Sequence, residues 1–523
     1  MTGTIGKALA DTTRLFPDRI FLTDGHYRIS FSEASAQIDQ ICGALLALGL
    51  RRHDRLALWL PNSPAWVMLA LACARLGILL VTVNTRNKVE ETAYILEKSR
   101  AKALIAVDRF WDIDYRAMLA EMATPHLEHV LWLDGGADDF GLKRWTEGFE
   151  PDAEMLLRAE ATVLVSDPAL AVFTSGTTGF PKGVVHSHVL LDNVRNFARM
   201  MHIEPVDVIL GHMPFYHIAG LVTALFQAVT LGCTLVTVAH WQADAAARLI
   251  VREKVAIFGG IPTHFIDLAD KVAELGFDTG CLKCAWIGGA SIAPDVARRA
   301  KQVLGLDALV AAYGMTETSA CTTLSRFDDP LEIAAEGKGV PIGDFEVKVA
   351  DPETGAARPV GENGEIWVRG SIVMQGYLED AEEMAKVMTG DGWFRTGDLA
   401  QFDAAGYLKI TGRLKDMFIV GGSNVYPAEV ERCLHQIPGV RQAVVVGVPN
   451  RRLGEVGFAF VERDGRAELT EDGILAFANA HMADYKVPRH LRFVENFPMT
   501  GTRKVQRHLL EAQARHLLGC EKP

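Results

Sequence analysis

Short apolar runs alternate with amphipathic stretches from Arg28 onward, and this alternation constrains the fold more than any other feature. The predicted strands are 28–31, 55–60, 78–84 and 104–107. The predicted helices between them are 34–48, 64–76 and 89–98, the first with Ser32 as its N-cap. Strands that alternate with helices in this way form parallel sheets flanked by those helices, so the chain is predicted to be α/β. At 523 residues it is long enough for two or more domains.

A glycine- and hydroxyl-rich stretch follows the predicted strand that ends at Phe173. Its candidate anion-binding residues are Thr174, Ser175, Gly176, Thr177, Thr178, Gly179 and Lys182. Glycine lets the backbone approach an anion closely, hydroxyl and amide groups donate hydrogen bonds to it, and the lysine adds a positive charge. Pro181 and Gly183 flank the lysine, so the stretch is not a Walker A loop. The stretch predicts a polyphosphate-binding loop rather than a plain Gly/Thr turn.

A second loop of this kind follows a predicted strand near residue 311. It reads Ala312-Tyr313-Gly314-Met315-Thr316-Glu317. Tyr313 offers a flat ring for a nucleotide base, and Thr316 offers a hydroxyl and an amide for a phosphate oxygen. Glu317 offers a hard carboxylate of the kind that Mg²⁺ prefers. A glutamate after a strand is more often a solvated charge, but the neighbouring Gly/Thr loop favours the metal ligand.

Three later segments carry further polar groups in a fixed order. Thr396-Gly397-Asp398 reads as a turn that presents a carboxylate, and 412–431 contains Arg413, Lys415 and the pair Gly421-Gly422. The last hundred or so residues predict strands at 443–448, 458–461 and 491–494, with helices that begin at Pro427 and after Thr470. Lys504 lies near the end of the chain in 496–507.

These segments together resemble the signature motifs of the adenylate-forming superfamily, which includes acyl-CoA synthetases, luciferases and the adenylation domains of peptide synthetases. The resemblance covers nearly the whole chain. It implies a large multi-subdomain N-terminal domain at 1–412, built of parallel sheets flanked by helices plus a small β-rich part. It also implies a hinge at 413–417 and a small mobile α+β domain at 418–523.

The resemblance assigns roles residue by residue. The implied catalytic residues are Lys504, Thr316, Glu317 and His217, with Glu317 as the Mg²⁺ ligand. The implied nucleotide and CoA contacts are the phosphate loop named above, Gly288, Gly289 and Ala290 beside adenine, Ala312, Tyr313, Gly314 and Met315, Asp398 and Arg413 at the ribose, Lys415 at the hinge, and Gly421 and Gly422 in the pantetheine channel. The implied acid pocket is Tyr216, His217, Gly220, Leu221, Trp286 and Met315. The chain departs from the family at Arg503, where glycine usually precedes the lysine.

The implied activity is an ATP- and Mg²⁺-dependent ligation of a small carboxylic acid to CoA through an acyl-adenylate. Because the implied pocket is apolar and shows no second cation, a monocarboxylic acid is expected, a fatty acid first and an aromatic or alicyclic acid next. Two alternatives stay open. In the first, the acyl group is transferred to a carrier protein or another acceptor instead of CoA. In the second, the chain is a catalytically dead nucleotide-binding module.

Net charge, apolar runs and cysteine usage indicate which partners and which compartment are expected. The net charge of −12 argues against a nucleic-acid surface. The charge-free run 218–239 is long enough to span a bilayer, but Gln227 and Gly232 interrupt it, and a buried helix followed by a buried strand is predicted there. The N-terminus lacks a signal-type apolar core, and the scattered cysteines suit a cytoplasmic protein. Peripheral membrane contact and a homodimer are left open.

Overall fold

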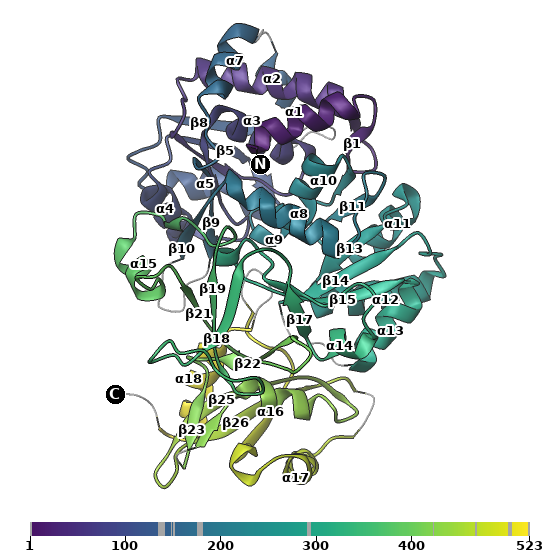
Figure 1. Cartoon of the computed structure of the whole chain (residues 1–523), viewed down its shortest axis with the longest axis vertical. Coiled ribbons are helices and arrows are strands. Elements are labelled where there is room, and N and C mark those ends of the chain that lie inside the picture. Colours follow the sequence, from purple (N-terminus) through teal and green to yellow (C-terminus); the bar gives the residue numbers. More distant parts are fainter. Residues whose placement is uncertain are drawn as a thin grey trace. The chain divides into compact units, whose positions relative to one another are not determined.

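The computed structural model describes residues 3–133, 142–147, 149, 152–174, 181–289, 294–421, 423–465, 468–499 and 505–520. The chain forms two compact units, each described by itself. The first comprises Met1–Ala290, Val296–Glu346 and Val368–Phe394, and the second comprises Ser291–Asp295, Val347–Trp367 and Arg395–Pro523. Both units combine helices with sheets, in agreement with the predicted α/β class (Figure 1). The predicted hinge at 413–417 stays a prediction.

The first unit contains a largely parallel sheet with the strand order β17-β16-β15-β14-β13-β11-β12-β1-β2. Its strands are β1 (Ile20–Thr23), β2 (Arg28–Ser30), β11 (Val208–Gly211), β12 (Thr234–Thr237), β13 (Ile257–Gly260), β14 (Cys284–Gly288), β15 (Ala308–Tyr313), β16 (Thr323–Leu324) and β17 (Lys338–Pro341). The pairs from β1 to β15 are parallel. Parallel neighbours end at the same edge, so the loops after β13, β14 and β15 lie beside one another.

A seven-stranded sheet in the same unit has the order β20-β10-β9-β4-β3-β5-β8. Its strands are β3 (Arg55–Trp59), β4 (Leu79–Thr82), β5 (Ala103–Val107), β8 (His129–Leu133), β9 (Pro168–Thr174), β10 (Lys182–Ser187) and β20 (Gly376–Tyr377). β9 and β10 pair antiparallel and flank the glycine-rich stretch, so Thr174 lies opposite Lys182. A small ribbon pairs β6 (Arg109–Phe110) with β7 (Ile113–Asp114).

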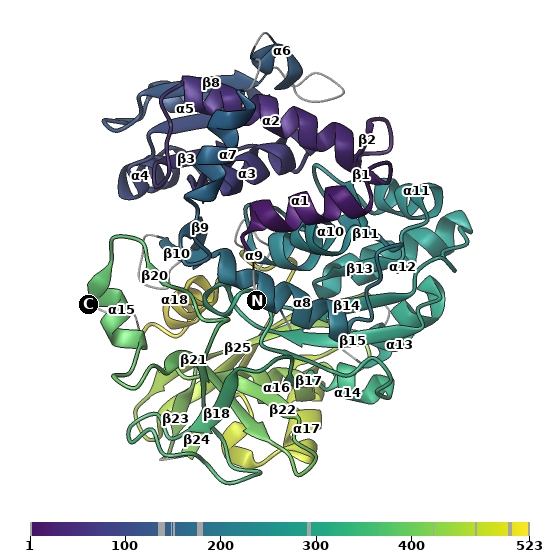
Figure 2. The same cartoon turned by 45° about the horizontal axis from the view of Figure 1, so that its top comes forward.

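Helices cover both sheets of the first unit. They are α1 (Ile5–Leu15), α2 (Phe31–Ala47), α3 (Pro64–Leu76), α4 (Val89–Ser99), α5 (Tyr115–Ala120), α6 (Leu142–Thr146), α7 (Ala153–Ala161), α8 (Leu191–Met200), α9 (Ile218–Gly220), α10 (Phe226–Leu231), α11 (Ala243–Glu253), α12 (Pro262–Leu275), α13 (Pro294–Leu304), α14 (Leu331–Ala335) and α15 (Ala381–Val387). Short turns add η1 (His188–Leu190), the π-helical η2 (Leu221–Leu225) and η3 (Thr316–Thr318). Figure 2 shows α1, α2 and α3 as one group of helices.

Local signals explain where several of these helices begin and end. The predicted helix 64–76 is confirmed, because Ser63 caps it, Pro64 occupies its first turn and Gly77 closes it with a left-handed φ of 66°. The predicted N-cap Ser32 is wrong. Ser30 caps α2 instead, through a capping box with Glu33.

The apolar run at 218–239 forms α9, η2, α10 and β12, as the helix-then-strand prediction required. Among the described residues, no helix has both the length and the apolar character needed to cross a bilayer.

The second unit contains two sets of strands. One is β18 (Glu346–Ala350), β19 (Gly364–Arg369), β21 (Phe394–Phe402) and β22 (Leu408–Arg413), in that order. The other comprises β23 (Phe418–Val420), β24 (Ser423–Val425), β25 (Val440–Asn450), β26 (Gly454–Arg463) and β27 (His490–Val494). Its helices are α16 (Pro427–Leu434), α17 (Glu471–His481) and α18 (Arg507–Leu517), with the short η4 (Asp484–Lys486).

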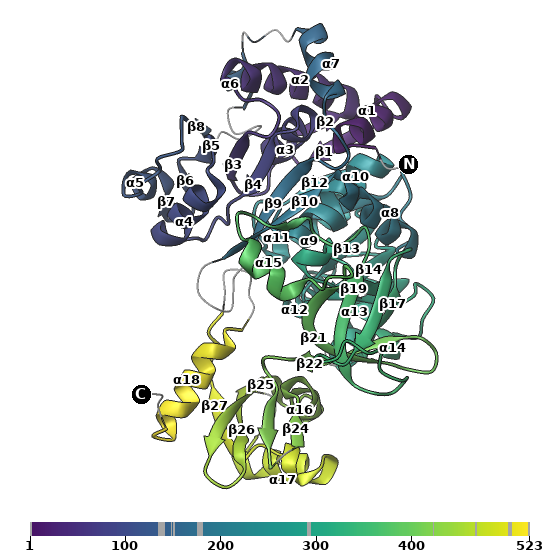
Figure 3. The same cartoon turned by 60° about the vertical axis from the view of Figure 1, so that its left-hand side comes forward.

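Alternating residues of β25 and β26 build a core on each face of their sheet. One face packs Val445 and Ala459 against Val430 of α16 and Ile474 of α17. The opposite face packs valine and phenylalanine side chains against Leu510 and Ala514 of α18. Figure 3 shows α18 on one side of these strands and α16 with α17 on the other. The predicted small α+β architecture of this region is therefore confirmed.

Candidate active site

The loop after β15 is a tight, buried turn. Residues Thr316 to Ser319 are buried, whereas Ala312 to Met315 stay half-buried. A Cβ on Gly314 would lie 2.2 Å from the carbonyl oxygen of Ala320, so only glycine fits this close approach. The predicted nucleotide-binding segment is thus a fixed turn in which Thr316 to Ser319 are buried and Tyr313 is half-buried.

Two buried side chains from neighbouring elements hold this turn in place. His186 of β10 contacts the carbonyl oxygen of Thr316 through Nε2 at 2.7 Å. Burial lowers the pKa of His186 to about 4, so the ring is neutral at neutral pH and Nε2–H donates. Asn193 of α8 donates to the carbonyl oxygens of Ser319 at 2.9 Å and Cys321 at 2.7 Å. The strand after the phosphate loop and the Glu317 turn are therefore directly connected.

Glu317 is a buried carboxylate with a defined partner. Its side chain is 9% exposed, and the Tyr377 hydroxyl donates to its Oε1 at 3.0 Å. The amide of Met374 donates to its carbonyl oxygen at 2.8 Å. Burial, and then the charge of Glu317, raise the pKa of Tyr377, so the phenol keeps its proton as a donor. The Tyr377 hydroxyl thus orients the Glu317 carboxylate, whose oxygen atoms are of the hard type that Mg²⁺ prefers.

Lys182 lies at the start of β10 with its charge already engaged. Its ammonium forms an ion pair with Glu383 of α15, and Nζ lies 5.1 Å from the centre of the Tyr377 ring. Hydrogen bonds from Lys182 and then Lys386 hold the pKa of Glu383 at about 2. The predicted phosphate-binding residues Ser175, Gly176, Thr177, Thr178 and Gly179 lie outside the described residues.

The predicted acid pocket begins after β11. His217 caps α9, with Nδ1 accepting from the amide of Ala219 at 3.2 Å. A Cβ on Gly220 would lie 2.4 Å from the carbonyl oxygen of Pro214, which makes glycine necessary there. Tyr216 is buried, and burial raises its pKa. Leu221, also buried, opens the π-helical turn η2, a distortion often found at functional sites.

Trp286 of β14 closes an apolar cavity under this region. Gly259 of β13 is its register partner, and a Cβ on Gly259 would lie 1.9 Å from the indole Nε1. The indole therefore lies flat in the space that the glycine leaves. The cavity measures about 10 Å³, enough for one water molecule. It is lined by Ile209, Leu210, Met213, Thr223, Ala224, Ile257, Phe258, Gly259 and Trp286.

The glycine pair after β14 lies beside the Tyr313 loop. Gly288 pairs with Ala312, and a Cβ on Gly288 would lie 2.7 Å from the Ala312 carbonyl oxygen. Gly289 has a φ of 76°, which disfavours other residues. Met315 packs against the buried side chain of Val184 and its neighbours. Ala290 lies outside the described residues.

In the second unit, Asp398 and Arg413 are brought together. Asp398 is 3% exposed, it pairs with Arg413 across β21 and β22, and Arg413 Nε lies 2.7 Å from its Oδ1. The predicted turn at Thr396–Asp398 is wrong, because these residues lie inside β21. Gly397 bends the strand there with a φ of 72°.

The remaining predicted residues of this unit are spread over two turns and the C-terminal stretch. Lys415 is exposed in the turn after β22, and Gly421 lies in the β23–β24 hairpin with a φ of 57°. Gly422 and Lys504 lie outside the described residues.

Tyr377, His186 and Glu383 are contact residues that the sequence alone does not reveal. None of the three belongs to a motif identified in the sequence. Tyr377 is 60 residues from Glu317, and Glu383 is 201 residues from Lys182. The pairing of β20 with β10 brings Tyr377 beside the strand that carries Lys182 and His186.

Comparisons with known proteins agree with this geometry. Residues 9–378 match the family described as AMP-binding enzyme, and residues 429–504 match the AMP-binding enzyme C-terminal domain. A Mycobacterium tuberculosis 7a-methyl-1,5-dioxo-octahydro-1H-inden-4-yl propanoyl:CoA ligase is 36% identical over 96% of this chain and 97% of its own. The medium-chain acyl-CoA ligase ACSF2 of Danio rerio is 34% identical over 99% of this chain and 89% of its own.

A solved structure extends the agreement to the fold. ATP-bound MatB from Rhodopseudomonas palustris is 28% identical, with a TM-score of 0.88 over 99% of this chain and 100% of that one. The family match spans well over half of the sequence and includes both glycine-rich loops. The chain therefore belongs to the AMP-binding enzyme family of adenylate-forming proteins, in its acyl-CoA ligase branch.

Proposed function

We propose that the protein is an acid:CoA ligase that uses ATP to activate a monocarboxylic acid. The observation that carries this proposal is the buried Glu317 carboxylate, held by Tyr377 at the end of β15 within a chain that matches acyl-CoA ligases over nearly its full length. A buried carboxylate that is oriented by a hydroxyl donor suits a cation that also binds phosphate.

The chemistry has two balanced steps. A carboxylate oxygen of the acid attacks the α-phosphorus of ATP, and the bond from that phosphorus to pyrophosphate breaks. The thiol of CoA then attacks the carbonyl carbon of the acyl-adenylate, the carbon–oxygen bond to AMP breaks, and the thiol proton is released. The first step joins two anions, so charge neutralisation and positioning dominate its catalysis.

Mg²⁺ is the proposed cofactor, and the donor set fits it. Mg²⁺ is commonly held by one or two carboxylates together with substrate phosphates and water. Glu317 supplies one hard oxygen donor, and the Thr316 backbone is fixed by His186. The ion would neutralise phosphate charge at this position.

Replacing Tyr377 by phenylalanine tests how Glu317 is oriented. The change removes the hydroxyl that donates to Oε1 and leaves the ring over Lys182. We expect the Mg²⁺ concentration for half-maximal pyrophosphate release to rise by about tenfold, the usual effect of losing a partner of a metal ligand. Tyr27→Phe is the control, because its hydroxyl also makes a hydrogen bond, to Gln37. An unchanged Mg²⁺ dependence would contradict the proposed role of Glu317.

For the substrate we propose a fatty acid first, and an aromatic or alicyclic acid next. The cavity beside η2 is lined mainly by apolar side chains, and among the described residues no lysine or arginine lines it. Such a lining favours a substrate with one carboxylate and an apolar body. Trp286 limits the space, because its indole fills the room above Gly259.

Trp286→Ala is expected to widen the acyl pocket. Removing the indole opens space next to a cavity of only about 10 Å³, so kcat/KM should shift towards longer or bulkier acids by about tenfold relative to the best wild-type substrate. The measurement is competition among acids of increasing length, with mass spectrometry of the products. Trp132→Ala, which removes a half-buried tryptophan from β8, is the control. If Trp286→Ala and the wild type show the same preference for acid length, Trp286 does not line the acyl pocket.

The activity itself is tested with ATP, Mg²⁺ and CoA across a panel from acetate to palmitate, with benzoate, hydroxycinnamates and cyclohexanecarboxylate. AMP release with formation of one class of acyl-CoA would support the proposal and name the substrate. Pyrophosphate release without acyl-CoA would point to a carrier-protein or other acceptor. Silence across the panel would favour a nucleotide-binding module and direct attention to Arg503.

The proposed location is the cytoplasm. All eight cysteines lie in the described part of the chain and are free thiols, which suits a reducing compartment.

A further inference from the structure

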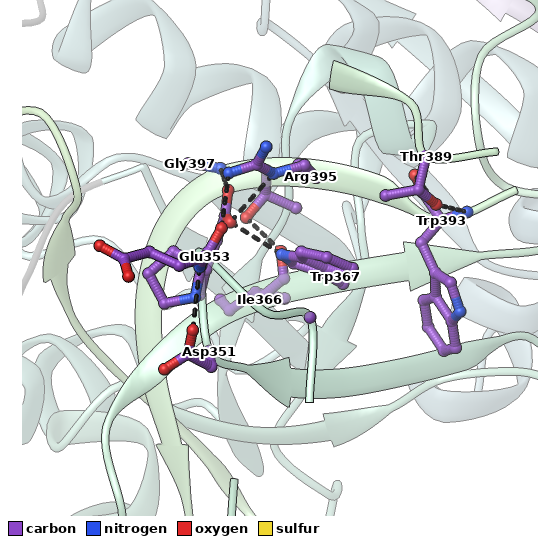
Figure 4. Close-up of polar contacts among 12 residues, drawn as sticks. Asp351, Glu353, Ile366, Trp367, Thr389, Trp393, Arg395 and Gly397 are labelled. Carbon is purple, nitrogen blue, oxygen red and sulfur yellow. Dashed lines mark hydrogen bonds and ion pairs between the residues drawn. The ribbon is translucent and has the colours of Figure 1, made fainter. Parts of the chain in front are cut away.

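Glu365 of β19 is a buried carboxylate outside the motifs that carry the proposed chemistry. It is 2% exposed and accepts three hydrogen bonds. Trp367 Nε1 donates at 2.7 Å, the amide of Gly397 at 3.0 Å and Arg395 Nε at 3.3 Å. Figure 4 shows Trp367, Arg395 and Gly397 converging on this contact. A buried carboxylate is costly unless paired and hydrogen-bonded, so three donors on one group form a built site.

The donors are arranged so that only an ionised carboxylate satisfies them. Oε1 accepts from the Gly397 amide, whereas Oε2 accepts from both Trp367 and Arg395. A glutamine in this place would point its NH₂ group, which is a donor, either at the Gly397 amide or at the N–H groups of Trp367 and Arg395, which are donors too. The site therefore requires the charge of Glu365 as well as its size.

One of these donors belongs to a segment with left-handed backbone, which glycine adopts readily. Gly397 has a φ of 72° inside β21, where extended residues have negative φ. Three further hydrogen bonds fix the same residues. Thr396 Oγ1 donates to the Ile366 carbonyl oxygen at 2.8 Å and accepts from the Asp398 amide at 3.1 Å. The Leu414 amide donates to the Gly397 carbonyl oxygen at 2.8 Å.

These hydrogen bonds fix the backbone of the segment that carries Asp398. Its carboxylate is buried and paired with Arg413 on β22, and the resemblance to adenylate-forming proteins implies that both contact the ribose. A carboxylate that accepts from two vicinal hydroxyls must be oriented to within a fraction of an ångström. The bend at Gly397 sets that orientation, and the Glu365 carboxylate holds the bend through the Gly397 amide.

We propose that Glu365 is a positioning residue for ribose recognition. It acts through the Thr396–Asp398 segment and does not itself touch the nucleotide. This inference rests on the proposed function only for the identity of the ligand, a nucleotide with a 2′-hydroxyl.

Glu365→Gln is the test, with ATP and 2′-deoxy-ATP compared as substrates. We expect KM for ATP to rise by about tenfold, as for a lost hydrogen bond to a charged group, while KM for 2′-deoxy-ATP, which keeps only the 3′-hydroxyl, rises by a smaller factor. The preference for ATP over the deoxy analogue therefore shrinks, and kcat and KM for the acid stay close to wild type. Glu462→Gln on β26, whose carboxylate pairs with Arg441, is the control.

A merely structural Glu365 would behave differently. It would lower the melting temperature and affect ATP and 2′-deoxy-ATP equally, and that result would overturn the inference. The glutamine of Glu365→Gln places its NH₂ donor against another N–H donor. Glu365→Asp is therefore the second variant. It keeps the charge, shortens the reach, and should shift the preference in the same direction by a smaller factor. An unchanged preference in both variants would also overturn the inference.

Calorimetry with AMP and 2′-deoxy-AMP separates this inference from the proposed function. If no acid in the panel is ligated, the activity assignment fails, yet the binding preference still reports on Glu365. If the wild type ligates acids and the preference does not move in the variants, the positioning role alone fails.

Discussion

Lys504→Ala is expected to lower the rate of acyl-adenylate formation by about 100- to 1,000-fold, the usual effect of removing one group that stabilises charge in a transition state. The lysine is assigned by its motif to the meeting of two anions, where its ammonium neutralises developing charge. Thioester formation from supplied acyl-adenylate should be largely retained, because that step does not involve the triphosphate. The two half-reactions are measured separately, by pyrophosphate release and by acyl-CoA formation from synthetic adenylate.

The matched control for Lys504→Ala is Lys271→Ala, since Lys271 is an exposed lysine of α12 that pairs with Glu274. It should leave both half-reactions close to wild type. Equal losses in the two half-reactions of Lys504→Ala would show that the residue does not act on adenylation specifically. Arg503, which replaces the glycine usual in the family, is adjacent, and its change to glycine separates loop geometry from charge.

Glu317→Gln is expected to reduce adenylation by about 100-fold or more, because it removes the negative charge that would hold Mg²⁺. The change keeps the side-chain volume, and the amide oxygen can still accept from Tyr377. The fold should therefore survive, and the loss should appear in kcat at saturating ATP. Pyrophosphate release over a Mg²⁺ titration measures it.

Glu332→Gln on the exposed side of α14 is the control for Glu317→Gln. The double variant Glu317→Gln/Tyr377→Phe adds a second check. If Tyr377 acts only through the Glu317 carboxylate, the double variant should lose no more activity than Glu317→Gln alone. Normal Mg²⁺ dependence in Glu317→Gln would place the metal elsewhere.

Features encoded by neighbouring residues could be predicted from the sequence. The helix Pro64–Leu76 carries its cap, its proline and its closing glycine within its own residues. The start of α2 could have been found too, because Ser30 and Glu33 have the spacing of a capping box. Ser32 directly precedes Glu33, whereas the reciprocal hydrogen bonds of a capping box require two residues between the partners.

Contacts between distant segments could not be predicted in this way. The Tyr377–Glu317 hydrogen bond depends on β20, which forms the edge of the seven-stranded sheet by pairing with β10, a strand far from it in the sequence. A Thr-Gly-Asp tripeptide is typical of turns and predicts one at Gly397, whereas pairing of β21 with β22 keeps the segment in a strand. Pattern reading identifies the groups that do the chemistry, and tertiary pairing decides which side chains orient them.

The contact between Gly259 and Trp286 makes these two positions one unit of variation. Each lies opposite the other in parallel strands, and the missing side chain of one is the space that the ring of the other occupies. A relative that tolerates a larger residue at position 259 must therefore carry a smaller one at position 286. Enlarging residue 259 alone is blocked by the indole, while a paired exchange moves volume across the pocket without changing its total. Acyl selectivity in such a scaffold therefore changes by a single substitution when residue 286 becomes smaller, and only in coupled steps when residue 259 becomes larger.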